Sequence, residues 1–202
     1  MLVDRTESEA PVEPETIYTI GHSNHSIGDF LALLKAAGLG AIADVRSAPY
    51  SRRNPQFNRE ALSSALKDNG VAYAWLGEEL GARPRDPSLR HSDGGVDFRR
   101  LAASAAFRRG IERVRDGARR FKLAIMCAER DPLNCHRTFL IARHLAGEDV
   151  AIRHVLGDGQ IIEHQEVERR VISNAFPNGH DLFAVSEDVL LNEAYDAWGR
   201  KL

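Results

Sequence analysis

Segments with the composition of β-strands alternate with helical patterns along most of this 202-residue chain. Five short apolar runs are expected to form strands: residues 16–20, 41–45, 71–75, 121–126 and 150–155. The fourth run is apolar at nearly every position, which is typical of a central strand covered on both faces. This alternation predicts an α/β fold with a mostly parallel sheet and helices on both faces, a Rossmann-like or flavodoxin-like three-layer sandwich.

Helical patterns are expected over residues 26–37, 58–69, 98–119, 135–145 and 161–172, with a weaker amphipathic run over 186–198. Ser26 and Asn58 are predicted N-caps, because their side-chain oxygens can accept from free backbone N–H groups. Residues 77–95 are rich in Gly, Pro and Arg. A loop of this length within a compact domain is usually functional or partly disordered.

The chain length and composition predict one domain with a substantial core. We expect an acidic leader over residues 1–15, a single α/β domain over 16–175, and a C-terminal extension over 176–202 that packs on it. Apolar residues make up 43% and charged residues 28%, close to an average soluble mixture. The longest apolar runs are far shorter than the roughly 20 residues that cross a bilayer. Two cysteines cannot form a disulfide framework, so we expect a cytoplasmic protein with reduced thiols and no membrane partner.

The net charge of −2 conceals an uneven distribution. Between Arg46 and Arg120 there are sixteen basic and nine acidic residues, and 23 of the 27 basic residues in the chain are arginine. Arginine binds phosphate and carboxylate groups through a planar fork. The basic middle segment is therefore either an anion-binding surface or a set of solvated helix faces.

Reactive and charged side chains follow three of the expected strands. His22 and Ser23 come after the first strand, and Asp44, Arg46 and Ser51 lie at the end of the second. After the fourth come five more: Cys127, Glu129, Cys135, His136 and Arg137. Ligands of open parallel sheets bind beyond the carboxyl ends of the strands. We therefore expect these groups to converge on one crevice.

These motifs resemble a known family. The segments that carry the resemblance are Thr19–Ser23, Asp44–Arg46 with Pro49 and Ser51, Cys127–Glu129, Cys135–Arg137, and His154–Val155 with Asp158–Gly159. They closely resemble the family called domain of unknown function 488 (DUF488), over about residues 16 to 170. The resemblance implies an α/β fold with these motifs at a site, and it brings no established reaction.

The residue chemistry suggests a role for each group. Cys135 is expected at a helix start beside cationic groups, which favours a nucleophilic or redox-sensitive thiolate. His22 and Glu129 are candidate acid–base groups, and Arg46 and Arg137 are candidate anion clamps. The remaining candidate ligand-binding residues are Ser23, Asp44, Ser51 and His136.

Simpler interpretations remain open for several of these residues. Cys127 could be a small hydrophobic group at a strand end, and Asp44 with Arg46 could be a structural ion pair. A thiol phosphatase would have arginine six positions after its cysteine, where this chain has Leu133. The spacing of Cys127 and Cys135 does not match the short pairs typical of structural zinc sites, and no metal ligand set is assigned.

The sequence therefore supports three functional hypotheses. The first is an enzyme that acts on a phosphate-bearing substrate such as a nucleotide or nucleic acid. The second is a non-catalytic nucleic-acid-binding module that uses Arg52, Arg53 and the arginines of residues 83–120. The third is a metal-dependent hydrolase that uses Glu129, Cys135, His136 and Asp44. Glycine-rich dinucleotide motifs are absent, so no nicotinamide cofactor is expected, and the cofactor is otherwise unknown.

Overall fold

The fold is described from a computed structural model, which places residues 15–147, 149–177 and 186–199. The expected acidic leader lies almost entirely outside the described residues. Within these residues the sheet has six strands: β1 (Glu15–Gly21), β2 (Ala41–Asp44), β3 (Ala72–Trp75), β4 (Leu123–Cys127), β5 (Val150–Val155) and β6 (Ile161–Glu163). Their order is β3-β2-β4-β1-β5-β6. The first five are parallel, and only β6 runs antiparallel, beside β5. The predicted α/β fold is confirmed.

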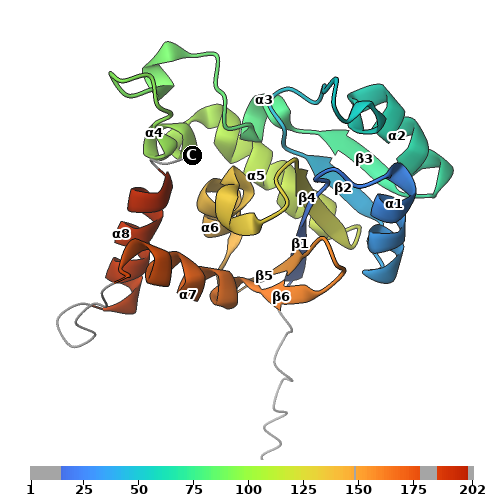
Figure 1. Ribbon diagram of the computed structural model, residues 1–202. Helices are drawn as coiled ribbons and strands as arrows, with labels where there is room; N and C mark the ends of the chain where they lie inside the picture. The colour runs from blue at the N-terminus through green and yellow to red at the C-terminus, as the bar shows by residue number, and fades with distance from the viewer. Residues whose placement is uncertain (1–14, 148, 178–185, 200–202) are drawn as a thin grey trace, which may run out of the picture.

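Helices cover both faces of this sheet (Figure 1). The longer ones are α1 (Ile27–Ala36), α2 (Arg59–Asp68), α4 (Phe98–Ala103), α5 (Ala105–Ala118), α7 (His164–Ala175) and α8 (Glu187–Gly199). Shorter segments are α3 (Gly77–Leu80), α6 (Arg143–Leu145), a π-helical segment (Arg137–Ala142) and 3-10 turns at Pro55–Phe57, Pro87–Leu89 and Pro132–Asn134. No helix among the described residues is long and apolar enough to span a membrane.

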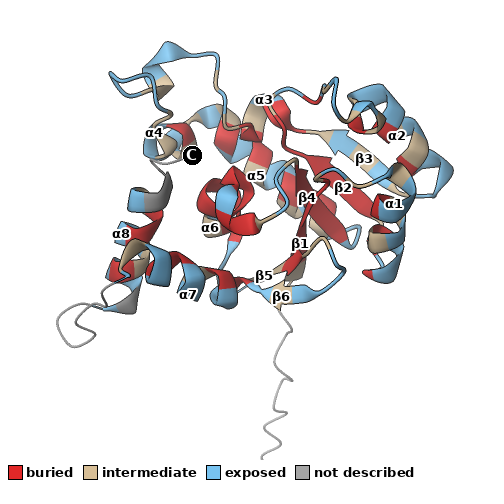
Figure 2. Cartoon of the chain, in the orientation of Figure 1, coloured by how far each residue is buried: buried red, intermediate tan, exposed pale blue. Residues whose placement is uncertain are grey.

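Two apolar clusters lie on opposite faces of the sheet. On one face, Phe30 of α1 and Leu62 of α2 pack with Ile42. On the other, Phe107 of α5 and Leu140 pack with Ile125. The central strands β1, β2 and β4 are consequently buried, whereas β3 at the edge alternates between exposed and half-buried residues (Figure 2).

A third cluster joins α7 and α8, in which Val167 and Val171 pack with Ala194 and Tyr195. The rings of Phe139 and Tyr195 meet edge to face, with centroids 5.6 Å apart. The helix beyond residue 175 thus packs on α7 and on the helical segment after β4.

The structure differs from the sequence prediction in three elements. Residues 161–163 form strand β6, so the helix expected from 161 begins only at His164. The helix expected over 98–119 is broken at Ser104, whose hydroxyl caps α5 by accepting from the Phe107 N–H. The helix expected from Cys135 begins with a π-helical segment at Arg137.

The two predicted N-caps behave differently. Ser26 accepts a hydrogen bond of 3.1 Å from the Asp29 N–H and begins α1. Asn58 stands at the N-cap position of α2, but its side chain accepts from the Ser51 N–H instead. Asn58 therefore fixes the loop after β2 and leaves the helix without a side-chain cap.

Candidate functional site

A cavity of about 780 Å³ lies where β2 and β4 end, and we call it the strand-end cavity. Parallel strands place their carboxyl ends at the same sheet edge, and Asp44 pairs with Met126 while Gly21 pairs with Cys127. The cavity is lined by charged, sulfur and imidazole side chains, among them Arg46, Arg83, Arg90, Cys127, Glu129 and His136. Groups that follow β2 and β4 thus meet at one place, as the fold prediction required.

Asp44 and Arg46 form a buried ion pair at the end of β2. Arg46 donates to the Asp44 carboxylate from Nη2 at 2.6 Å and from Nε at 2.8 Å. Tyr73 donates its hydroxyl to the same carboxylate at 2.8 Å, and Arg46 also donates to the carbonyl of Phe57 at 2.9 Å. The bidentate geometry and the extra donors satisfy both charges, which a buried pair requires.

His22 follows β1 and contacts this pair. Arg46 Nη1 lies 3.1 Å from His22 Nε2, and His22 Nδ1 lies 2.8 Å from the Ser23 carbonyl. Arginine can only donate, so Nε2 accepts and Nδ1–H donates, which fixes one neutral tautomer. Burial and the nearby Arg46 charge lower the pKa of His22 to about 4. His22 is not among the residues that line the cavity, and its ring stacks on Phe57 with centroids 4.3 Å apart.

The loop after β4 is held against β1 by backbone contacts. The His22 and Ser23 N–H groups donate to the carbonyls of Cys127 and Ala128, each at 2.9 Å. A Cβ atom at Gly21 would overlap the carbonyl oxygen of Glu129, so only glycine permits this approach. The sequence of β1 therefore sets the position of the segment that carries Glu129.

Arg137 also fixes this loop. Its side chain is 1% exposed, and it donates to the carbonyls of Glu129 at 2.7 Å and Arg130 at 3.3 Å. Arg137 is the first residue of the π-helical segment, and π-helical turns are often found at functional sites. The guanidinium therefore organises backbone around Glu129.

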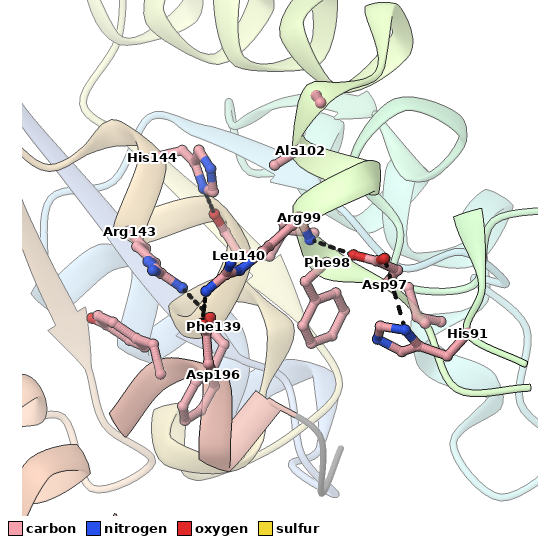
Figure 3. Close-up of a pocket in the computed structure, with 13 residues that line it drawn as sticks. His91, Asp97, Phe98, Arg99, Ala102, Phe139, Leu140, Arg143, His144 and Asp196 are labelled. Atoms are coloured by element: carbon pink, nitrogen blue, oxygen red, sulfur yellow. Dashed lines mark hydrogen bonds and ion pairs between the residues drawn. The ribbon is translucent and has the colours of Figure 1, made fainter. Parts of the chain in front are cut away.

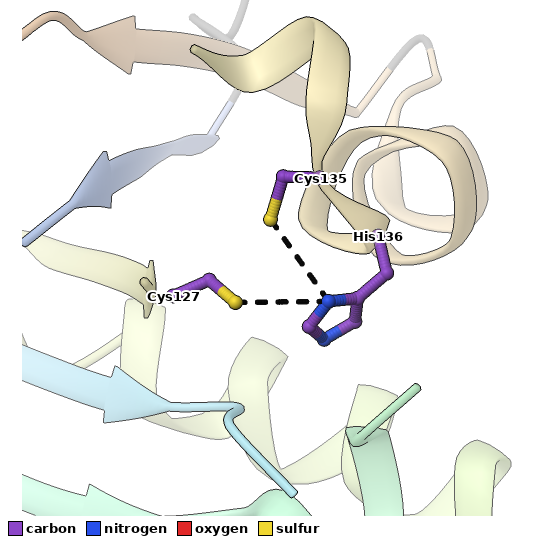
Figure 4. A group of neighbouring side chains, drawn as sticks. All are labelled: Cys127, Cys135 and His136. Atoms are coloured by element: carbon purple, nitrogen blue, oxygen red, sulfur yellow. Dashed lines mark hydrogen bonds between the residues drawn. The ribbon is translucent and has the colours of Figure 1, made fainter. Parts of the chain in front are cut away.

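The two sulfurs of Cys127 and Cys135 and the imidazole of His136 gather at the end of β4 (Figure 4). His136 Nδ1 lies 3.7 Å from Cys127 Sγ and 3.9 Å from Cys135 Sγ. Cys135 Sγ donates to Glu129 Oε2 at 3.1 Å. The ring and both thiols are buried, whereas Glu129 is exposed at the cavity wall. A sequence separation of eight thus becomes a compact cluster, because the turn Pro132–Asn134 brings the chain back to the strand end.

The electrostatics of this cluster are unusual. Burial opposes ionisation of Cys135, but the Cys127 hydrogen bond and the Arg137 charge lower the pKa of the Cys135 thiol. The hydrogen bond to Cys135 and burial raise the pKa of Cys127. The carboxyl of Glu129 is partly withdrawn from water and lies beside Cys135, so its pKa is raised. Of the two thiols, Cys135 is therefore the one that ionises more easily.

Other predicted site residues lie outside the cavity lining. Ser23 has a φ of 49°, alone among the described residues other than glycine, and its hydroxyl donates to Asn24. Ser51 accepts from the N–H groups of Arg53 and Asn54 and shapes the loop after β2. Asp44 and Arg137 are likewise absent from the lining. Ser23, Ser51, Asp44 and Arg137 form hydrogen bonds with other protein groups, and these bonds hold the site in place.

Sequence reasoning missed Tyr73 and Trp75, which come from edge strand β3. Tyr73 supports Asp44, and the Trp75 indole donates to the Arg46 carbonyl at 2.9 Å. A Cβ atom at Gly77 would overlap that carbonyl and the same indole. Two aromatic residues spaced two apart on one strand were the available signal, because alternate residues share a face.

A second cavity, of about 720 Å³, lies between α4 and α8 (Figure 3). Its charged groups are paired: Asp196 contacts Arg99 and Arg143, while Asp97 contacts His91 and Arg100. None of the three residues of the sulfur cluster lines this cavity, and its ion pairs link α8 to the rest of the molecule. We therefore place the functional site at the strand ends.

Comparison with known proteins identifies the family. The chain matches the family described as "Domain of unknown function DUF488" over residues 26–144. It belongs to the DUF488 family. The DUF488 match contains Asp44, Arg46 and the whole segment from Cys127 to Arg137, and the expected membership is confirmed over these residues. The motifs at 19–23 and 154–159 lie outside the matched residues.

No curated protein and no solved structure matched the chain significantly. Within the DUF488 match, the described residues that follow β2 and β4 meet at the strand-end cavity. The part of the molecule that identifies the family is therefore also the part that forms the candidate site.

Proposed function

We propose that this DUF488 protein is an enzyme that acts on a phosphate-bearing substrate, such as a nucleotide, bound in the strand-end cavity. The observation that carries the proposal is the meeting of Arg83 with Glu129 and His136 around this cavity. The Arg83 guanidinium would bind the phosphate, while the Glu129 carboxylate and the neighbouring cluster of Cys127, Cys135 and His136 would provide the reactive groups.

The anion-binding role belongs to Arg83 first. Its side chain is exposed, and none of the described residues forms a hydrogen bond or an ion pair with its guanidinium. Arg90 lies nearby but donates to the carbonyls of Gly94 and Pro84. Arg46 contacts protein groups through all three side-chain nitrogens, and Arg137 donates to two backbone carbonyls through its two Nη atoms, which favours positioning roles for both. The phosphate would therefore be bound at the rim, with the rest of the substrate directed towards Glu129.

Glu129 is the proposed general acid–base group. It is exposed to the cavity, and its raised pKa brings it nearer to the range in which a carboxyl can exchange protons at neutral pH. Cys135 is 1% exposed and does not line the cavity, so direct attack on substrate is less favoured for its sulfur. His22 is neutral and bonded at both nitrogens, which favours a role in holding Arg46.

A nucleic-acid ligand is the second candidate. Arg108 and Arg109 on α5 are exposed and have no ion-pair partner among the described residues, which would allow contacts with a longer phosphate backbone. Such contacts would make affinity fall steeply with salt. An oligonucleotide in the ligand panel, measured at two salt concentrations, separates this candidate from a mononucleotide enzyme.

The decisive experiment is a turnover assay on the full chain. Nucleoside mono-, di- and triphosphates, sugar phosphates and oligonucleotides are incubated with wild type and with Glu129→Gln, and the products are separated by chromatography. We expect turnover of at least one compound and a loss of about 100-fold or more in Glu129→Gln, the size typical of general acid–base catalysis. Glu78→Gln is the matched control, since Glu78 is exposed and outside the cavity lining. Turnover unaffected in Glu129→Gln, or no turnover of any compound, would reject the proposal.

A further inference from the structure

The sulfur cluster has the dimensions of a metal site. The donor atoms of Cys127, Cys135 and His136 all lie within 4.8 Å of one another. Bond lengths of zinc to sulfur and nitrogen at a tetrahedral angle place sulfur and nitrogen about 3.5 Å apart and two sulfurs about 3.8 Å apart. The two sulfur-to-nitrogen distances here are 3.7 and 3.9 Å. The sulfur-to-nitrogen distances need shifts of only a few tenths of an ångström, and the two sulfurs, which lie within 4.8 Å of each other, would approach by up to about 1 Å to complete the coordination geometry.

The chemistry of the donors selects the ion. Two thiolates and an imidazole are soft and intermediate ligands that favour zinc, whereas calcium and magnesium require oxygen ligands. The buried thiols of Cys127 and Cys135 lie close to the Glu129 carboxylate, and all three groups carry negative charge when they ionise. A divalent cation would offset that charge. The Arg137 N–H donates to Cys135 Sγ at 3.5 Å, a contact of the kind that supports a metal-bound thiolate.

We propose that Cys127, Cys135 and His136 bind a zinc ion through Sγ, Sγ and Nδ1, with the fourth position facing Glu129 and the strand-end cavity. Cys127, Glu129 and His136 line this cavity, so the ion would be reached from it. Three protein ligands and one open position are the arrangement of catalytic zinc sites, whereas structural sites have four protein ligands. Compared with the ligand set considered from sequence, Cys127 replaces Asp44, which is bound to Arg46 and Tyr73.

The site would supply the nucleophile for the proposed function, and this part of the inference rests on that function. A zinc-bound water gives one proton to Glu129 and becomes hydroxide. The hydroxide oxygen forms a bond to the electrophilic atom of the substrate, the bond to the leaving group breaks, and Glu129 returns the proton to that group. Glu129 Oε2 lies 3.1 Å from Cys135 Sγ, close enough to contact a water on the ion.

Metal binding is tested on the full chain without reference to activity. Protein is produced in zinc-supplemented medium and purified under reducing conditions, and its zinc is measured by elemental mass spectrometry. We expect about one zinc per chain in wild type and a loss of at least tenfold in Cys127→Ser and Cys135→Ser, because zinc affinity depends on the thiolate ligands. His91→Gln is the matched control, since His91 lines the same cavity but lies outside the cluster.

A second measurement covers variants that fail to fold. Cobalt added to reduced, metal-free wild type should give thiolate-to-cobalt charge-transfer absorption, and circular dichroism reports whether each variant is folded. Folded Cys135→Ser with the zinc content of wild type would overturn the proposal. So would the absence of cobalt bands in wild type, or a Cys127–Cys135 disulfide in place of bound metal.

The two proposals can fail separately. Stoichiometric zinc in a protein that turns over no phosphate compound would preserve the metal site and reject the proposed function. Turnover that persists after complete removal of the metal would preserve the function and reject the zinc-bound nucleophile.

Discussion

The guanidinium of Arg137 donates a 2.7 Å hydrogen bond to the backbone carbonyl of Glu129. This bond joins the start of the π-helical segment to the loop that follows β4, and Arg137 is almost completely buried while making it. An arginine that could have bound a ligand instead sets the position of the residue that faces the cavity.

Replacing Arg137 with Met should destabilise the fold. The change removes the charge-assisted hydrogen bonds that the buried guanidinium donates to the carbonyls of Glu129 and Arg130, so we expect the free energy of unfolding to fall by about 2–4 kcal/mol. Urea unfolding followed by circular dichroism measures the change. Arg130→Ala, an exposed neighbour, is expected to stay within about 0.5 kcal/mol of wild type. Equal stability of Arg137→Met and wild type would show that the guanidinium does not hold this loop.

Gly21→Ala tests the contact between β1 and the same loop. A methyl group at Gly21 overlaps the Glu129 carbonyl, so the loop must move, and we expect a loss of about 1–3 kcal/mol. Gly40→Ala is the control, because a Cβ atom there meets nothing within 4 Å. Thermal unfolding of the two variants provides the comparison, and similar transition temperatures would contradict the close approach.

Asp44→Asn should be among the most damaging substitutions near the site. It leaves the buried Arg46 charge without its carboxylate, at a cost of about 3–5 kcal/mol in the free energy of unfolding. Tyr73→Phe removes one supporting hydrogen bond and should cost about 1–2 kcal/mol. Chemical denaturation of both variants tests this order. A Tyr73→Phe loss as large as that of Asp44→Asn would mean that the ion pair contributes little.

Stability should fall as the pH is lowered below about 6.5, owing to buried neutral histidines. Burial lowers the pKa of His164 to about 4, and the ring contacts His154 and Tyr195. Between pH 6.5 and about 4, His164 binds a proton in the unfolded chain but stays neutral in the folded chain. The stability contributed by the neutral ring is therefore complete above 6.5 and is lost as the pH falls to about 4, up to about 3 kcal/mol. Urea unfolding across this range should show a weaker pH dependence in His164→Gln, and an unchanged dependence would assign the effect to other groups.

Much of the fold could be predicted from sequence because its signals are local. The apolar run that became β4 and the Ser26 cap of α1 each depend on a few adjacent residues. The error at Ile161–Glu163 has a different origin. This strand exists because it pairs with β5, and a three-residue segment before a helix has no periodicity of its own.

The candidate site was predictable only in part, for a related physical reason. The rule for parallel sheets indicated which strand ends would meet, and Glu129 with His136 does reach the cavity. The sequence does not reveal which arginine can bind a ligand. In the folded protein Arg46 binds Asp44 and Arg137 binds a backbone carbonyl, and these partners depend on the fold. The compact cluster of Cys127, Cys135 and His136 likewise depends on the path of the loop between them.

Calorimetric titration of the full chain with inorganic pyrophosphate tests phosphate binding in the strand-end cavity directly. Binding in the strand-end cavity through Arg83 predicts that Arg83→Ala weakens affinity by about tenfold or more, equivalent to about 1.4 kcal/mol. Arg85→Ala, an exposed arginine two residues away and outside the lining, should bind like wild type. Equal affinity of Arg83→Ala and wild type, or no heat of binding in wild type, would contradict phosphate binding through Arg83 in this cavity.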